Sequence, residues 1–109
     1  MTSALSGIRV LDLTQVMAGP WCTQILADLG ADVIKVEPVI GGDQSRSTMG
    51  APTPTGTSAG FNAVNRNKRG VALDLKTDRG RRQLHQLAGH SDVLDVCKAC
   101  RRGRRTHPR

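Results

Sequence analysis

An apolar run, a glycine-proline turn, a helical pattern and a second apolar run follow one another in the first third of the chain. This order constrains the fold more than any other feature of the sequence. Residues 8–13 are typical of a strand buried on both faces. Gly19 permits a sharp turn, and Pro20 suits the first helical position because its missing N–H would be unpaired there. We expect a helix from about Pro20 and a second strand over residues 32–37, which together form a right-handed βαβ unit.

The apolar residues of this helix recur at helical spacing, so we expect them to form its buried face. They are Trp21, Cys22, Ile25, Leu26 and Leu29. Cys22 is therefore expected to lie in the core, as free cysteines commonly do. The helix N-terminus offers unpaired N–H groups to a phosphate, but the turn lacks the G-x-G-x-x-G pattern of dinucleotide-binding proteins. Glu37 could hold a ribose hydroxyl or be a solvated strand end.

The remaining elements extend the α/β pattern. Two further strands are expected over residues 71–75 and 92–96, and Thr77 or Asp78 is expected to cap a helix that ends near Gly89. This helix should bury Leu84, Leu87 and Ala88. The sequence thus predicts an incomplete Rossmann-like parallel sheet built from βαβ units.

The segment between the second and third strands is expected to be irregular. Residues 38–60 are rich in Gly, Pro, Ser and Thr and predict a long loop, followed by a short helical turn at 61–65. Arg46 in this loop could meet a phosphate or carboxylate, or be solvated. Arg66, Lys68 and Arg69 could form an anionic subsite through charge-assisted hydrogen bonds, or a solvated loop.

The net charge of +7 is unevenly distributed along the chain. Residues 1–97 hold ten Lys or Arg and all nine acids, whereas residues 98–109 hold six Lys or Arg and no acid, so the two parts carry +1 and +6. The basicity belongs to the tail and argues against nucleic acid as the main partner of the folded part. We divide the chain into a folded part, residues 1–96, and a basic tail, residues 97–109, which we expect to be disordered.

The cysteines and histidines give no metal site. Cys97, Cys100 and His107 provide three candidate ligands, fewer than the four of a structural zinc site. His85 and His90 have no carboxylate or cysteine partner in the pattern and are expected at the surface. The cysteines are odd in number, and no apolar segment resembles a signal peptide or membrane span, so we expect a cytoplasmic protein without a membrane contact.

Six motifs stand in a fixed order along the chain: LSGIRVLDL at 5–13, MAGP at 17–20, LADLGADVIKVE at 26–37, Gly42-Asp43, NRNKR at 65–69 and LDLK at 73–76. In order and spacing they resemble the amino-terminal part of family III CoA-transferases, the CaiB/BaiF family. The resemblance covers roughly residues 5–95. It implies a CoA-binding part of an enzyme that moves CoA between carboxylic acids.

The resemblance also implies where CoA would bind. In members of the family, the segment that matches LDLK contacts the nucleotide portion of CoA. In this chain that segment is expected at the carboxyl end of a strand, where open α/β sheets bind ligands. The residues it assigns to CoA are Met17, Ala18, Arg69, Leu73, Asp74, Leu75 and Lys76. Pro38 is a departure, because several relatives have an arginine there that meets a phosphate.

The family places its catalytic aspartate downstream, so the resemblance implies no catalytic residue in this chain and a chain that is inactive alone. Its partners would be an acyl-CoA and a carboxylic acid, in an interlocked homodimer. After Asp95 the sequence departs from the family pattern, and we expect a frameshift or a misplaced end there. Two alternatives stay open: a racemase-type isomerase with the same CoA contacts, and a small nucleic-acid-binding protein that uses the tail.

Overall fold

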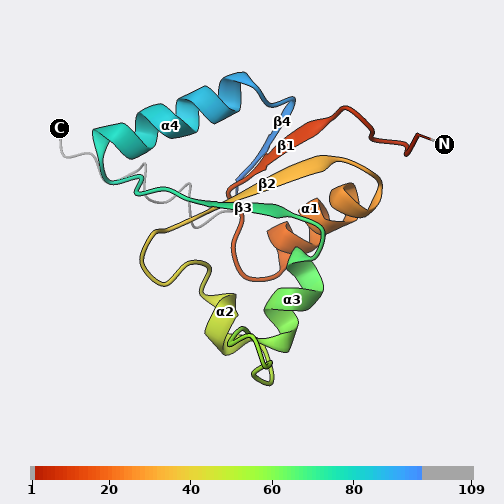
Figure 1. Cartoon of the computed structure of the whole chain (residues 1–109), viewed down its shortest axis with the longest axis vertical. Coiled ribbons are helices and arrows are strands. Elements are labelled where there is room, and N and C mark those ends of the chain that lie inside the picture. The colour runs from red at the N-terminus through yellow and green to blue at the C-terminus, as the bar shows by residue number, and fades with distance from the viewer. Residues whose placement is uncertain (1, 97–109) are drawn as a thin grey trace.

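A four-stranded parallel sheet forms the centre of the structure, a computed structural model that describes residues 2–96 (Figure 1). The strands lie in the order β3-β2-β1-β4, and every neighbouring pair is parallel. In chain order they are β1 (Arg9–Asp12), β2 (Asp32–Glu37), β3 (Arg69–Ala72) and β4 (Val93–Asp95). The predicted α/β fold with an incomplete Rossmann-like sheet is confirmed.

Helices cover both faces of this sheet (Figure 1). The helices are α1 (Ala18–Asp28), α2 (Ser45–Thr48), α3 (Ala59–Asn65) and α4 (Asp78–Gly89), and α2 lies beside α3, away from the sheet (Figure 1). The chain moves in one direction across the sheet from β1 to β3, so right-handed crossovers put α1 and α3 on the same face. It then returns past β1 to reach β4, which puts α4 on the other face.

Each face of the sheet has its own apolar cluster, because successive side chains of a strand point to opposite faces. On the α1 face, Val10 and Val33 pack with Ala27 and Ala31. The cluster on the α4 face consists of Leu11, Ile34, Val36 and Leu73, with Leu84, Leu87 and Ala88 of α4 packed against it. The predicted apolar face of α4 is confirmed.

The buried face of α1 differs from the prediction. Trp21 and Ile25 are 57% and 48% exposed, and Cys22 is exposed as well, so the prediction that Cys22 lies in the core is wrong. The buried residues of α1 are Pro20, Thr23, Gln24 and Ala27. The reason lies beneath the helix, where the Thr23 hydroxyl donates to the buried carboxylate of Asp12 at 2.7 Å. A buried carboxylate needs such donors, so Thr23 turns inward beside Ala27. Of the predicted apolar residues, Leu26 does pack against the core.

Element boundaries also differ from the prediction, most clearly in three places. α1 begins at Ala18, and Pro20 occupies its third position, where an N–H would still lack an intrahelical partner. β3 spans Arg69–Ala72 and begins two residues earlier than the predicted strand at 71–75, so the residues after Ala72 leave the sheet. The predicted loop over 38–60 contains α2 and the first two residues of α3.

The predicted helix cap and surface histidines are confirmed. The Thr77 hydroxyl accepts from the Gly80 N–H at 3.0 Å and begins α4, and His85 and His90 are both exposed. No helix among residues 2–96 combines the length and apolar character needed to cross a membrane. The expected basic tail, with its candidate metal ligands, lies outside the described residues.

Candidate functional site

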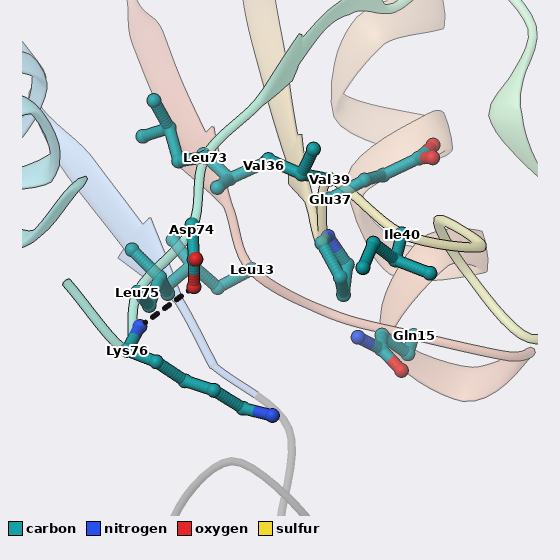
Figure 2. Close-up of a pocket in the computed structure, with 11 residues that line it drawn as sticks. Leu13, Gln15, Val36, Glu37, Val39, Ile40, Leu73, Asp74, Leu75 and Lys76 are labelled. Carbon is teal, nitrogen blue, oxygen red and sulfur yellow. Dashed lines mark hydrogen bonds between the residues drawn. The ribbon is translucent and has the colours of Figure 1, made fainter.

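A cleft of about 340 Å³ lies at the carboxyl ends of β1, β2 and β3 (Figure 2). It is lined by Leu13 and Gln15 after β1, by residues 36–40 at the end of β2, and by residues 73–76 after β3. This edge is where open α/β sheets bind ligands. Most lining residues are apolar, and the polar ones are Gln15, Glu37, Asp74 and Lys76.

Residues 73–76 form one wall of the cleft. Leu73 is buried, and its N–H donates to the Glu37 carbonyl at 3.0 Å, which fixes the start of the segment against β2. The Asp74 carboxylate then accepts from the Lys76 N–H at 3.0 Å, as Figure 2 shows. This Asx turn places Leu75 and the exposed Lys76 side chain along the rim. All four predicted residues of this segment thus line the cleft.

The ammonium of Lys76 is available to a ligand. No carboxylate within residues 2–96 forms an ion pair with Lys76. The other polar groups of the lining are the Gln15 amide and the carboxylates of Glu37 and Asp74. The remaining lining residues are apolar, and one of them, Ile40, is 92% exposed. Within the described residues, no three His, Cys, Asp or Glu side chains gather as they would around a metal ion.

Met17 and Ala18 lie at the amino end of α1, a short distance along the chain from Gln15. Met17 precedes the helix, and its carbonyl accepts from the Trp21 N–H at 2.8 Å. Its side chain is 52% exposed, and Ala18 is exposed too. Neither residue lines the cleft, whereas Gln15 does.

The arginines of the cationic segment before β3 pair with carboxylates away from the cleft. Arg69 begins β3, and its Nε and Nη2 donate to the two carboxylate oxygens of Asp32 at 2.9 and 2.7 Å. The hydrogen bond from Arg69 is the main reason that the pKa of Asp32 lies below its usual value. Arg66 pairs with Asp28. The amino end of β3 is the edge opposite the cleft, so the structure does not bring Arg69 together with Lys76.

Arg46, whose role the sequence left open, pairs with Glu37. Its Nε and Nη2 donate to the two carboxylate oxygens of Glu37 at 2.8 and 2.9 Å. Its guanidinium also lies 4.2 Å from the centre of the Phe61 ring. Because Glu37 lines the cleft, this pairing balances a negative charge at the wall.

Lys68 and Asp12 form a buried ion pair beneath α1. The Lys68 Nζ lies 3.0 Å from Asp12 Oδ2, and the two side chains are 2% and 0% exposed. The same ammonium donates to the Pro20 carbonyl at 2.9 Å and to Asn65 Oδ1 at 3.0 Å. Burial lowers the pKa of Lys68, although Asp12 opposes this shift. The pair therefore ties β1, α1 and α3 together.

Lys35 and Asp43 form a second buried pair, next to the turn between β1 and α1. Their Nζ and Oδ2 atoms are 2.7 Å apart, with the side chains 3% and 0% exposed. Asp43 also accepts from the N–H and hydroxyl of Ser45 and from the Val16 N–H. Burial acts to raise the pKa of Asp43, but the hydrogen bonds from Lys35 and Ser45 outweigh it, so the pKa lies below its usual value.

Sequence reasoning does not find these two pairs. Asp12 is 56 residues from Lys68 along the chain, and only the fold closes that separation. The one visible signal is Gly42-Asp43, which stands as a motif of its own between a strand and a loop.

Acid is expected to weaken the fold through Asp43. Its folded pKa lies below the usual 3.8, so the stabilisation is complete above that pH and is lost as the pH falls through the folded pKa. Urea unfolding at about pH 6 and about pH 3 should therefore show a lower free energy of unfolding in acid. The matched variant Lys35→Met/Asp43→Asn lacks this titration and should lose less. An equal loss in both proteins would contradict the assignment.

The sequence matches the family described as CoA-transferase family III over residues 5–104. It is 46% identical over 93 residues to the succinyl-CoA–L-malate CoA-transferase beta subunit of Chloroflexus aurantiacus, a match that covers 85% of this chain and 23% of that protein. It is 49% identical over 90 residues to the succinyl-CoA:glutarate CoA-transferase of Mus musculus, which covers 83% of this chain and 20% of the relative.

The comparison with solved structures also indicates similarity to this family. The chain is similar to a CAIB/BAIF family protein from Brucella suis, with a TM-score of 0.77 and 40% sequence identity, over 86% of this chain and 25% of that one. The chain thus spans about a quarter or less of the length of these relatives. The sequence and fold comparisons agree, and the chain belongs to CoA-transferase family III.

Proposed function

We propose that this chain forms the CoA-binding part of an enzyme that transfers CoA between an acyl-CoA and a carboxylic acid. The observation that carries the proposal is the cleft at the carboxyl ends of β1 to β3, where an apolar wall ends at the ammonium of Lys76. CoA has matching parts, since its adenine ring has apolar faces and its phosphates are anionic. The relatives that match are CoA-transferases, which supports the same ligand.

Each part of the cleft has a proposed role. The backbone of residues 73–75 and the apolar wall pack along the nucleotide, and Lys76 donates a charge-assisted hydrogen bond to a phosphate. Met17 and Ala18 bring the amino end of α1, with its unpaired N–H groups, to the phosphate side. We do not include Arg69 among these contacts, because Asp32 holds its guanidinium at the opposite edge.

We propose that this part of the enzyme binds CoA and takes no covalent part in the transfer. The transfer needs a nucleophile that attacks the thioester carbonyl. Asp12 and Asp43 are fully buried and ion-paired, and neither lines the cleft. Of the two carboxylates that line the cleft, Glu37 pairs with Arg46, and Asp74 accepts from the Lys76 N–H. We therefore assign the nucleophile to none of these four carboxylates.

Replacing Lys76 with alanine is expected to weaken CoA binding about tenfold. One charge-assisted hydrogen bond at an exposed rim contributes about 1.4 kcal/mol, which is a factor of ten in Kd. Isothermal titration calorimetry of the full chain with CoA measures the change. Pantetheine lacks the phosphates, so its Kd should be the same for both proteins.

Arg79→Ala is the matched control for this experiment. Arg79 is an exposed cation three residues farther along the chain, on α4, and it does not line the cleft. Its loss changes the net charge equally and should leave the Kd for CoA within about twofold. Equal weakening by both substitutions would assign the effect to net charge. Failure of the unaltered chain to bind CoA would overturn the proposed function.

A further inference from the structure

The turn between β1 and α1 contains a residue in an uncommon backbone conformation. Val16 has a φ of +71°, in the left-handed region that a β-branched side chain rarely adopts. Such a conformation persists only where the surrounding structure holds it. Gln15, the residue before it, lines the cleft, so the conformation of this turn decides where the Gln15 amide lies.

The buried Lys35–Asp43 pair holds this turn at two backbone points. The Lys35 Nζ donates to the Thr14 carbonyl at 3.2 Å. Both carboxylate oxygens of Asp43 accept from the Val16 N–H, at 3.2 and 3.3 Å. The two points lie on either side of Gln15. The Lys35 Nζ and the Asp43 Oδ2 lie 2.7 Å apart, so the hydrogen bonds on the two sides of Gln15 belong to one connected network.

The other side of the turn is closed by α1. A Cβ atom placed on Gly19 would lie 2.3 Å from the Thr14 Cβ, so the first turn of α1 packs directly against Thr14. Thr14 is fully buried, and its N–H donates to Asp12 Oδ1 at 2.8 Å. With Thr14 fixed on this side, the position of the Val16 N–H determines the path of the turn.

We propose that Asp43, anchored by Lys35, is a positioning residue for the cleft: it holds Val16 in the left-handed conformation and thereby sets Gln15 against the bound ligand. This inference rests on the proposed function, since it concerns how the CoA cleft is shaped. It assigns a role to the Gly42-Asp43 motif, which lies outside the cleft lining. Asp43 touches no ligand in this arrangement and acts through the turn.

The test compares two double variants that share the loss of charge. Replacing a buried ion pair with apolar side chains of similar volume commonly preserves stability, so Lys35→Met/Asp43→Leu should fold. This variant removes the acceptor of the Val16 N–H. Lys35→Met/Asp43→Asn keeps an amide oxygen at the same position, so it retains that acceptor without the charge.

The variants are expected to differ in binding and in local protection. Lys35→Met/Asp43→Leu should bind CoA at least about tenfold more weakly, and its Val16 amide should exchange with solvent at least about tenfold faster. Lys35→Met/Asp43→Asn should remain within about threefold of the unaltered chain in both measurements. Thermal unfolding should show both variants folded at the assay temperature. Should leucine prevent folding, Lys35→Met/Asp43→Ser takes its place, because its hydroxyl is one bond shorter and does not reach the Val16 N–H.

Two results would overturn the inference. Equal CoA affinity in both variants and the unaltered chain would show that the acceptor does not shape the cleft. Equal weakening in both would show that the Lys35 ammonium or the charge of the pair, which both variants lack, matters and that the oxygen at position 43 does not. Absence of CoA binding by the unaltered chain is a different failure, which overturns the proposed function. The Val16 exchange rates would then still decide whether Asp43 holds the turn.

Discussion

Replacing Lys68 with methionine is expected to lower the free energy of unfolding by about 3–5 kcal/mol, the usual cost of removing one partner from a buried ion pair. The substitution leaves the Asp12 carboxylate, which is 0% exposed, without its cation. It also removes the donors to the Pro20 carbonyl and to Asn65. A small domain has only about 5–15 kcal/mol of total stability, so the substitution removes a large share of it. Urea unfolding followed by circular dichroism measures the change.

Arg66→Met is the matched control. Arg66 belongs to the same cationic segment and also pairs with a carboxylate, Asp28, but the two side chains are 60% and 39% exposed. An exposed pair contributes about 1 kcal/mol or less, so this variant should stay close to the unaltered chain. A similar loss from both substitutions would contradict the assignment of Lys68 to the buried network.

Gly80→Ala is expected to destabilise the chain by about 1–3 kcal/mol and to weaken CoA binding as well. A Cβ atom at Gly80 would lie 1.9 Å from the carbonyl oxygen of Asp74 and 2.6 Å from its carbonyl carbon. Backbone atoms cannot turn aside as a flexible side chain can, so the segment around Asp74 must shift. That segment forms a wall of the cleft. Chemical unfolding and calorimetry with CoA measure the two effects.

Gly89→Ala in the same helix serves as the comparison. A Cβ atom there meets nothing within 4 Å, and Gly89 is the last residue of α4. Alanine is the better helix former, so this variant should be unchanged or more stable by up to about 1 kcal/mol. If Gly80→Ala also proved neutral, α4 would not pack as closely on Asp74 as the structure indicates.

Local patterns were sufficient to predict the four strands and the helices α1, α3 and α4, but not α2. The apolar runs at β1 and β2 are short and nearly continuous, which is typical of strands buried on both faces, and the structure buries them in that way. Thr77 begins α4 because its hydroxyl meets an N–H only three residues away, an interaction that depends on no distant residue. The position of the cleft at the strand ends follows from the parallel order.

The buried face of α1 could not be predicted from its own residues. Trp21, Ile25 and Leu26 are its most apolar residues, and helical spacing alone predicts that all three are buried, but only Leu26 packs against the core. The structure turns Thr23 inward because the carboxylate of Asp12 lies under the helix and requires a hydroxyl donor. The helical pattern does not record that requirement, because Asp12 belongs to another element.

The surroundings of Lys68 and Arg69 could not be predicted from the sequence either. They are adjacent in the sequence and read as one cationic group, yet Lys68 is buried against Asp12 while Arg69 pairs with Asp32 at the amino edge of the sheet. Successive side chains of an extended segment point to opposite sides, so neighbours meet different surroundings. The charge of each side chain can be read from the sequence, whereas its carboxylate partner depends on the fold.

The sequence by itself determined the family, the parallel α/β arrangement and the segment 73–76 that lines the cleft. The parallel arrangement rests on turn chemistry and apolar periodicity, which neighbouring residues specify together. The family and the segment 73–76 rest on the resemblance of the six motifs to family III CoA-transferases. Only the tertiary structure decided which charges are buried in pairs, which face of α1 is covered and how Asp43 reaches the Val16 N–H. The physical reason is that burial and ion pairing depend on atoms brought together from distant parts of the chain, and a linear pattern does not contain those distances.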